Sequence, residues 1–206
     1  MTIRALSLIA LIPMLGGCSL LPASTRRSLA RPYKPTNVAV LPLPQSREDA
    51  NQAAGATLLQ PVFITELTKR RLFEVIPISV ETLHSLTAGS GWGADAALPP
   101  DFFERLRQLT DCDAVVFASL TVYRPYPPLQ TGLKVRLVDC REHQTWWAVD
   151  EVFDAGVESV AAGAESYART ELSLPNPLLA DTGVLHSPLR FGQYVASALV
   201  ATLPAH

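Results

Sequence analysis

The sequence has few charged residues and few cysteines. Of its 206 residues 17% are charged, the net charge is −2, and only three are cysteines. No long stretch of lysine and arginine supplies the positive surface that binds nucleic acid, so we expect no nucleic-acid partner. Internal repeats and low-complexity segments are also missing. Apolar residues make up 48% of the chain, enough to bury a core, which excludes an intrinsically disordered protein.

Motifs for catalysis and cofactor binding are missing as well. There is no Gly-x-Ser-x-Gly motif, and the glycine-rich segment at residues 89–93 lacks the lysine that follows a phosphate-binding loop. The histidines do not have the spacing of a metal site: His84, His143, His186 and His206. Four aspartates near predicted strand ends either form acid pairs or are solvated strand termini: Asp111, Asp113, Asp139 and Asp150. We therefore predict no catalytic residue, no metal and no cofactor.

The first 18 residues have the features of an export signal. Arg4 supplies a positive charge, residues 5–15 are mainly apolar, and Gly16 and Gly17 precede Cys18. This apolar run is too short to span a bilayer, which requires roughly 20 residues. The pattern predicts a signal peptide at residues 1–17. An ordinary secretory signal followed by a chance cysteine is the alternative.

The sequence Leu15-Gly16-Gly17-Cys18 resembles the lipobox of bacterial lipoproteins. The resemblance implies that the Cys18 thiol receives a diacylglycerol, that the chain is cut before Cys18, and that the new amine is acylated, with palmitate as a typical chain. Each buried methylene contributes about 0.8 kcal/mol, so several chains attach the protein stably to lipid. Ser19 stands where inner-membrane lipoproteins of enterobacteria carry aspartate, which implies an outer-membrane protein that faces the periplasm.

Residues 18–35 predict an acylated N-terminus and a linker. The segment has no hydrophobic periodicity and no acidic residue, and it contains four basic residues: Arg26, Arg27, Arg31 and Lys34. It either lies against anionic lipid headgroups or is a solvated spacer. The folded part is then residues 36–206, which we predict to be one periplasmic domain.

Strand and helix patterns alternate along residues 36–206. Short apolar runs predict strands at residues 37–43, 73–78, 113–123, 133–140 and 145–153. Helical spacing or capping signals predict helices at residues 50–72, after 99–101, from 157, and from the Ser187-Pro188 pair. The sequence therefore predicts the α/β class: a single three-layer-like domain with a mixed sheet flanked by helices.

Some local features of this pattern are less regular. Pro61 is expected to kink the helix at residues 50–72 or to mark a second helix start. Residues 81–97 have no clear assignment, and their glycines favour a loop. A long proline-rich loop is expected between the strands at 113–123 and 133–140. Lys134 and Arg136 alternate with apolar residues, which predicts one solvated face on the second of these strands.

The order of these elements is similar to a superfamily of periplasmic lipoprotein domains. The resemblance lies in Val38–Leu43, Leu72–Ile76, Asp113–Val116 and Val135–Asp139. The superfamily includes the curli secretion channel, the penicillin-binding-protein activators and flagellum-associated outer-membrane lipoproteins. It implies a small α/β domain that binds partners and is not a catalyst. No pair of segments resembles the membrane-inserting hairpins of the curli channel, which argues against a pore.

Cys112 and Cys140 are the remaining cysteines. Both lie 14 residues from Tyr126, so a hairpin symmetric about that residue brings them opposite each other. Facing cysteines in an oxidising periplasm favour a disulfide. Two buried free thiols are the alternative.

Four residues are candidates for partner contact, because exposed aromatics and arginine are common in binding hot spots: Trp92, Tyr123, Arg124 and Tyr126. Local packing of these rings on prolines is the alternative. Together these features predict a non-catalytic accessory or assembly lipoprotein that binds an envelope protein partner. A subunit of a secretion ring, which would be a homo-oligomer, and a cell-wall-acting enzyme are the other two hypotheses.

Overall fold

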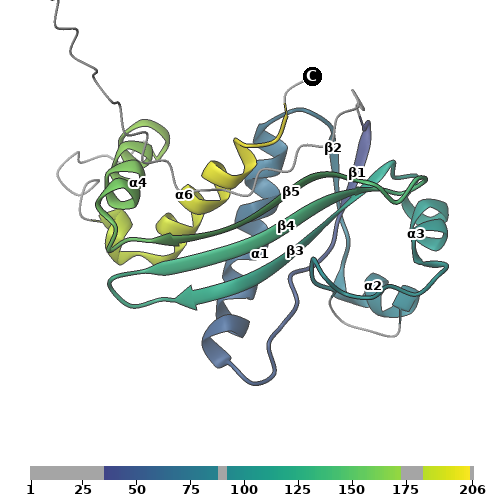
Figure 1. The fold of residues 1–206 in the computed structure, drawn as a ribbon, viewed down its shortest axis with the longest axis horizontal. Helices are drawn as coiled ribbons and strands as arrows, with labels where there is room; N and C mark the ends of the chain where they lie inside the picture. The colour runs from purple at the N-terminus through teal and green to yellow at the C-terminus, as the bar shows by residue number, and fades with distance from the viewer. Residues whose placement is uncertain (1–34, 88–91, 173–182, 205–206) are drawn as a thin grey trace, which may run out of the picture.

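The computed structural model describes residues 35–87, 92–172 and 183–204. Within these residues, five strands form one mixed sheet in the order β2-β1-β3-β4-β5 (Figure 1). β1 is parallel to both β2 and β3, whereas β3, β4 and β5 form an antiparallel meander. The strands are Asn37–Val40 (β1), Glu74–Pro77 (β2), Ala114–Arg124 (β3), Gln130–Asp139 (β4) and Thr145–Asp154 (β5). The predicted signal peptide, Cys18 and nearly all of the linker lie outside the described residues.

The helices pack on both faces of this sheet. They are Ala50–Lys69 (α1), Val80–Thr87 (α2), Phe102–Thr110 (α3), Glu158–Glu171 (α4) and Pro188–Val200 (α6), with a short 3-10 helix at Val184–His186 (η1). Buried residues of α1, α4 and α6 share one core with one sheet face, and those of α2 and α3 share a second core with the other face. None of the helices in the described ranges is long and apolar enough to cross a bilayer.

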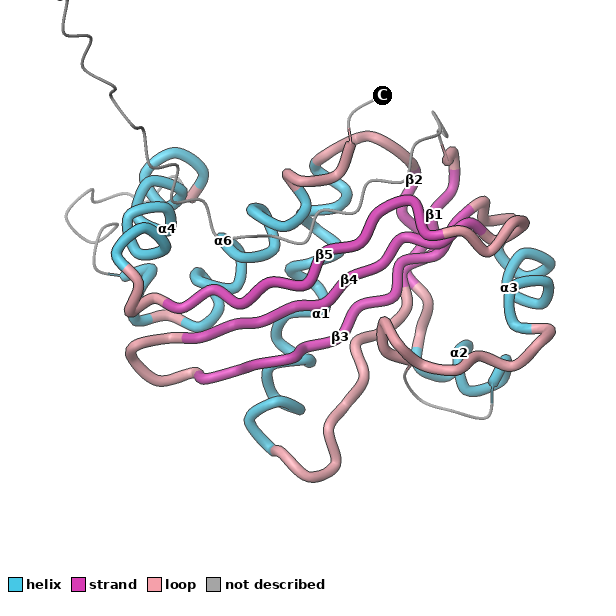
Figure 2. The backbone as a smooth tube through the Cα atoms, in the orientation of Figure 1, coloured by secondary structure: helices cyan, strands magenta, loops and turns pink. Residues whose placement is uncertain are grey.

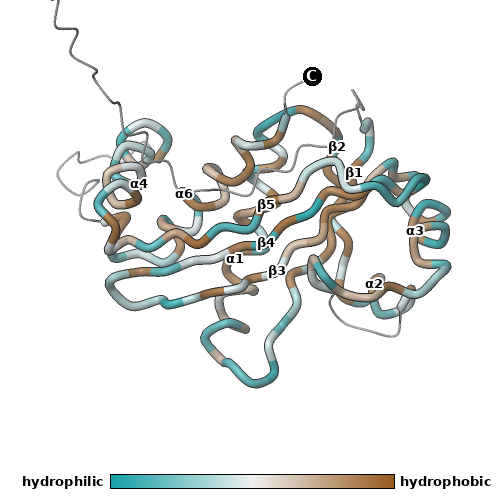
Figure 3. The backbone as a smooth tube through the Cα atoms, in the orientation of Figure 1, coloured by the Kyte–Doolittle hydropathy of each residue, from teal (hydrophilic) through white to brown (hydrophobic). Residues whose placement is uncertain are grey.

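Alternation along β1 explains why both faces are covered there. Val38 and Val40 belong to the core under α1 and α6, whereas Ala39 belongs to the core under α2 and α3. All three are fully buried, as expected for a central parallel strand. Figure 3 shows the hydrophobic colour of β1 continuing into the neighbouring part of β3.

The second helical layer covers only part of the sheet. Phe117 and Val138 are the last residues of β3 and β4, going towards the hairpin turn, that pack in the core of α2 and α3. Further along, side chains on this face are polar or solvated, as in Lys134 and Asp150. Figure 2 shows α2 and α3 beside one end of the β3–β4 hairpin, with its turn at the other end. The third layer is therefore partial, because among the described residues α2 and α3 cover this face only near one end of the hairpin.

Two glycines let the helices approach closely. A Cβ on Gly55 of α1 would lie 2.7 Å from the Tyr123 ring of β3, and one on Gly192 of α6 would overlap the Leu59 side chain of α1. α1 is therefore in close contact with the sheet on one side and with α6 on the other.

The structure confirms the α/β class and the mixed sheet, with several local corrections. α1 continues through Pro61 as one helix, so the proline does not mark a second helix start; the carbonyl that loses its donor there, that of Thr57, belongs to a solvent-exposed residue. Residues 80–87 form a helix, α2, where the glycines of the following segment had favoured a loop. The connection between β3 and β4 is residues 125–129, shorter than predicted, because pairing extends to Arg124 and Gln130.

Candidate functional site

The turn of the β3–β4 hairpin is held by hydrogen bonds at both of its strands. The Arg124 Nε–H donates to the Pro128 carbonyl at 2.7 Å. On the next strand, the Asp154 carboxylate accepts the Gly156 N–H at 2.8 Å and the Gln130 amide at 2.6 Å. These bonds, first that of Gly156, hold the pKa of Asp154 below its usual value. The side chain of Leu129 is buried, which fixes the base of the turn.

Three exposed apolar side chains lie at this end of the sheet. Tyr126 is 66% exposed, and Val152 and Val157 are each 50% exposed. Val152 is paired with Gly132, and the Ala155 N–H donates to the Leu129 carbonyl, which brings the chain before α4 to the turn. We call Tyr126, Val152 and Val157 the tip patch. Residues of this kind on an ordered turn suit protein contact.

The four predicted contact residues do not form one surface. Arg124 and Tyr126 lie at the hairpin turn. The Tyr123 ring instead packs against α1 at Gly55, and burial raises the pKa of its hydroxyl. Trp92 is half-buried beside the core of α2 and α3, and its indole N–H donates to the Thr87 hydroxyl at 2.8 Å. Of the three predicted aromatic residues, Tyr126 is therefore the one whose ring is exposed to a partner. That it binds a partner stays a prediction.

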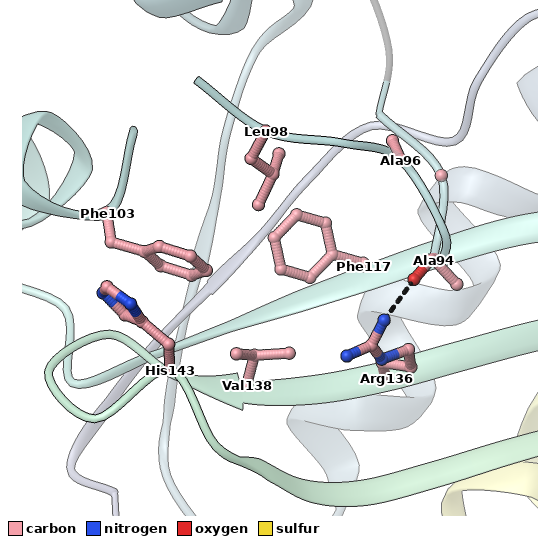
Figure 4. Close-up of a pocket in the computed structure, with 9 residues that line it drawn as sticks. Ala94, Ala96, Leu98, Phe103, Phe117, Arg136, Val138 and His143 are labelled. Carbon is pink, nitrogen blue, oxygen red and sulfur yellow. Dashed lines mark hydrogen bonds between the residues drawn. The ribbon is translucent and has the colours of Figure 1, made fainter. Parts of the chain in front are cut away.

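A cavity of about 190 Å³ lies near the other end of the hairpin, on the partly open face (Figure 4). Its lining comes from four separate parts of the chain: residues 93–98, α3, the hairpin strands and the β4–β5 turn. The apolar part of the lining includes Leu98, Phe103, Phe117 and Val138. The polar part includes Arg136 and His143. Sequence reasoning missed this site because its residues are far apart in the chain.

The β4–β5 turn positions His143 in the cavity wall. The carboxylate of Asp139, which is only 4% exposed, accepts the N–H groups of Arg141 and Glu142. His143 follows with a left-handed φ of 57°, and its N–H donates to the Asp139 carbonyl. The imidazole then stacks on Phe103 of α3, with 4.4 Å between ring centroids and 22° between planes. The buried carboxylate of Asp139 thus orders the turn, and the turn places His143 against Phe103.

Arg136 extends from β4 along the side of the same cavity. Its Nη1 donates to the Ala94 carbonyl at 2.8 Å, and its Nη2 donates to the Thr145 hydroxyl at 2.9 Å. Neighbouring Lys134 is paired differently, since its ammonium lies 2.6 Å from Asp95 and 3.8 Å from Asp150. The hydrogen bond to Asp95 raises the pKa of Lys134.

The structure brings Cys112 and Cys140 together, as the sequence predicts, but as free thiols. Both are buried, and their sulfurs are 3.6 Å apart. The register differs slightly from the prediction, because the Cys140 N–H donates to the Asp113 carbonyl and not to residue 112. The hydrogen bond from the Cys140 thiol lowers the pKa of Cys112 to about 7. The same bond raises the pKa of Cys140. The disulfide itself stays a prediction.

Two of the four aspartates near predicted strand ends have structural roles. Asp113 accepts the N–H groups of Thr36 and Asn37 at 2.9 and 3.2 Å. Asp111 ends α3 with a left-handed φ of 51°. These contacts favour strand termini over acid pairs. Within the described residues, no group of three or more histidines, cysteines or acids is placed to hold a metal ion.

Comparison with known proteins gives likenesses of structure only. No protein-family model matches the chain, and no curated protein sequence matches it. A PelC dodecamer from Paraburkholderia phytofirmans is similar at 11% identity, over 87% of this chain and 92% of that one, with a TM-score of 0.48. Lipoprotein GNA1162 from Neisseria meningitidis is similar at 19% identity, over 66% of this chain and 100% of that one, with a TM-score of 0.43.

A third solved structure is the hypothetical protein CT253 from Chlamydia trachomatis. It is 22% identical, and the likeness covers 81% of this chain and 98% of that one with a TM-score of 0.39. Identities and TM-scores as low as these assign neither function nor assembly to the chain.

Proposed function

We propose that this protein is a membrane-anchored envelope lipoprotein that acts without catalysis, by docking a protein partner through its tip patch. In this proposal the acyl chains on Cys18 hold it to the outer membrane, facing the periplasm, and the tip patch is the contact surface. One geometric relation carries the proposal. The start of β1, from which the chain leads back to Cys18, lies beside the start of β3, whereas the hairpin turn follows the other end of β3; Figure 1 shows β1 and the turn at opposite ends of the sheet.

The dimensions of the chain support this arrangement. Thr36 is bonded to Asp113 at the start of β3, and Arg124 ends the same strand. A strand of this length spans about 35 Å at the usual rise per residue. The segment between Cys18 and Pro35 reaches at most about 55 Å when extended. A domain attached in this way can present its tip patch well away from the bilayer surface.

The non-catalytic part of the proposal has separate support. Asp113 and Asp139 accept main-chain N–H groups, and His143 stacks on a phenylalanine. These side chains have positioning roles in the fold, and none of them forms a nucleophile–base pair with a neighbour. Three exposed apolar side chains, those of Tyr126, Val152 and Val157, lie at the end of the sheet that carries the ordered turn, and exposed apolar residues are a feature of binding surfaces.

The anchor is tested by labelling cells with radioactive palmitate. We expect the full chain to incorporate the label and to fractionate with the outer membrane, and Cys18→Ser to lose both properties. An unlabelled wild-type chain, or an unchanged distribution of Cys18→Ser, would contradict the lipoprotein assignment.

The docking surface is tested by a photo-crosslinking amino acid placed in the full-length acylated protein. We expect a discrete adduct with a different envelope protein from position 126, and loss of that adduct in Val152→Asp. Position 109 is a matched control, because Leu109 is 57% exposed on α3, away from the turn. Adducts only between copies of this chain would support a ring subunit in place of an accessory protein, and equal adducts from both positions would argue against the tip patch.

A further inference from the structure

We propose that the cavity beside Arg136 and His143 binds a small carboxylate that carries one apolar group. In this assignment Arg136 receives the carboxylate, and Phe103, Phe117 and Val138 contact the apolar group. The site is separate from the tip patch, so the assignment does not depend on the docking function.

The charge of Arg136 is the first observation. Its two hydrogen bonds go to neutral acceptors, a carbonyl and a hydroxyl. Within the part of the chain that the structure describes, no carboxylate lies within 4 Å of its guanidinium nitrogens. The residue is only partly exposed and lines a cavity whose other lining residues include Phe103, Phe117 and Val138. A guanidinium in such surroundings favours an anion, and three of its five N–H groups are still available to donate.

The contrast with Lys134 makes this observation more specific. Lys134 projects from the same face of β4, two residues away, and it is paired with Asp95 and Asp150. Both nearby acids therefore lie within ion-pair distance of the lysine, and no ion pair with either acid is formed by Arg136. An anionic ligand would give Arg136 the negatively charged partner that Lys134 already has in Asp95 and Asp150.

The apolar wall is the second observation. Phe117 and Val138 are each 4% exposed and belong to the core. Phe103 meets Phe117 edge-on, with ring centroids 6.3 Å apart and an interplanar angle of 75°. Figure 4 shows Leu98, Phe103, Phe117 and Val138 around one space, with the guanidinium of Arg136 at its side. Packed rings form a pre-ordered wall, so a ligand would cause little rearrangement.

The volume limits the size of the ligand. An apolar cavity of about 150 Å³ accepts benzene. A volume of about 190 Å³ therefore has room for one ring or a short aliphatic chain, together with a carboxylate near Arg136. Two sources have this chemistry: a free small acid, and the C-terminal residue of a polypeptide when its side chain is apolar.

The test uses titration calorimetry with the full-length acylated protein in phospholipid nanodiscs, with empty nanodiscs as a blank. The probes are 3-phenylpropanoate and its neutral amide, which has the same shape. We expect saturable binding of the acid and at least about tenfold weaker binding of the amide, because the amide cannot form the charge-assisted hydrogen bonds. Equal binding of the two probes, or no binding of the acid at millimolar concentration, would overturn the proposal.

Variants then place the binding at this cavity. Arg136→Gln should weaken the binding of 3-phenylpropanoate by about tenfold or more. Arg105→Gln is the matched control, since Arg105 also donates two hydrogen bonds, to the Ser85 and Leu86 carbonyls, but lies outside the cavity. His143→Asn keeps a residue that tolerates the left-handed backbone and removes the ring that stacks on Phe103, so it should weaken binding as well. Unchanged affinity in Arg136→Gln would sink the assignment.

A second pair of probes separates the two sources. A tetrapeptide that ends in phenylalanine is compared with the same peptide amidated at its C-terminus. Tighter binding of the free-acid peptide than of 3-phenylpropanoate supports a polypeptide terminus, and tighter binding of 3-phenylpropanoate supports a free small acid.

Discussion

Asp113 and Asp139 each fix a piece of backbone by accepting two main-chain N–H groups. Asp113 holds Thr36 and Asn37 at the start of β1, and Asp139 holds the turn that carries His143. In both cases the carboxylate accepts hydrogen bonds from main-chain N–H groups that have no carbonyl partner in the irregular backbone. The sequence placed these aspartates at strand ends. It did not predict their acceptor roles, because those depend on the positions of main-chain groups up to 77 residues away.

Removing the Asp139 carboxylate should destabilise the domain. Asp139→Ala leaves the Arg141 and Glu142 N–H groups without their acceptor, so we expect a loss of about 1–3 kcal/mol in the free energy of unfolding. Asp150→Ala is the control, since that side chain is 54% exposed and should change stability by no more than about 0.5 kcal/mol. Urea denaturation measures both, and equal effects would contradict a structural role for Asp139.

Acid should weaken the hairpin turn through Asp154. The pKa of this carboxyl is lower in the folded protein than its usual value of 3.8. Its stabilising contribution is therefore complete above that pH and is lost as the pH falls through the folded pKa. Unfolding midpoints recorded between pH 5 and pH 2 should decline more in the wild type than in Asp154→Asn. Parallel declines of the two proteins would contradict this role.

The cysteine pair gives a prediction that depends on the compartment. The sulfurs are 3.6 Å apart, so small side-chain rotations bring them to the bond length of about 2.05 Å. We expect mass spectrometry of unreduced periplasmic protein to recover the two cysteines in one linked peptide. A disulfide between Cys112 and Cys140 should raise the free energy of unfolding by about 3–4 kcal/mol relative to the reduced protein. A peptide that carries a free Cys112 thiol would contradict the prediction.

At the scale of elements, local signals predicted the helices with caps best. The Ser187 hydroxyl accepts the Arg190 N–H and Pro188 begins α6, as the Ser-Pro pair indicated. α2 was not predicted, because the glycines that follow it dominated the pattern. Its burial of Leu83 and Leu86 against the sheet compensates for a weak local signal. Tertiary packing of this kind cannot be derived from a short window of sequence.

The contact between α1 and α6 should be sensitive to one methyl group. Gly192→Ala places a Cβ against the buried Leu59 side chain, so we expect a loss of about 1–3 kcal/mol in stability. Ser197→Ala is the control on the same helix, at a half-buried position, and should be nearly neutral. Thermal unfolding of the two variants measures the difference. A neutral Gly192→Ala would show that the two helices separate easily.

For the whole molecule, the sequence predicted the class of fold but not its asymmetry. Apolar runs and helical periodicity were sufficient for an α/β domain with a mixed sheet. They could not show that α2 and α3 cover only part of one face, because polar and apolar residues alternate along most of β4 whether or not a helix covers that part of the strand. The hairpin turn was predicted as a contact region, whereas the cavity at Arg136 is assembled from four segments and has no local sequence signal.

Changes in the tip patch should separate binding from folding. Tyr126, Val152 and Val157 are all at least half exposed, so Tyr126→Ser and Val157→Ser should each change the free energy of unfolding by no more than about 0.5 kcal/mol. The same variants should lose most of the partner adduct formed with a crosslinker at position 152. Retention of the adduct at full yield would show that the partner binds elsewhere.

The central position of β1 has a mechanical consequence. This strand is the first described element, and it pairs in parallel with β2 on one side and β3 on the other, with Asp113 holding its beginning. Tension applied through residue 35 would load both rows of ladder bonds together in shear, whereas an edge strand would peel away bond by bond. If the proposed function is correct, a domain built in this way bears a pull between the lipid anchor and the docked protein without unravelling from its first strand.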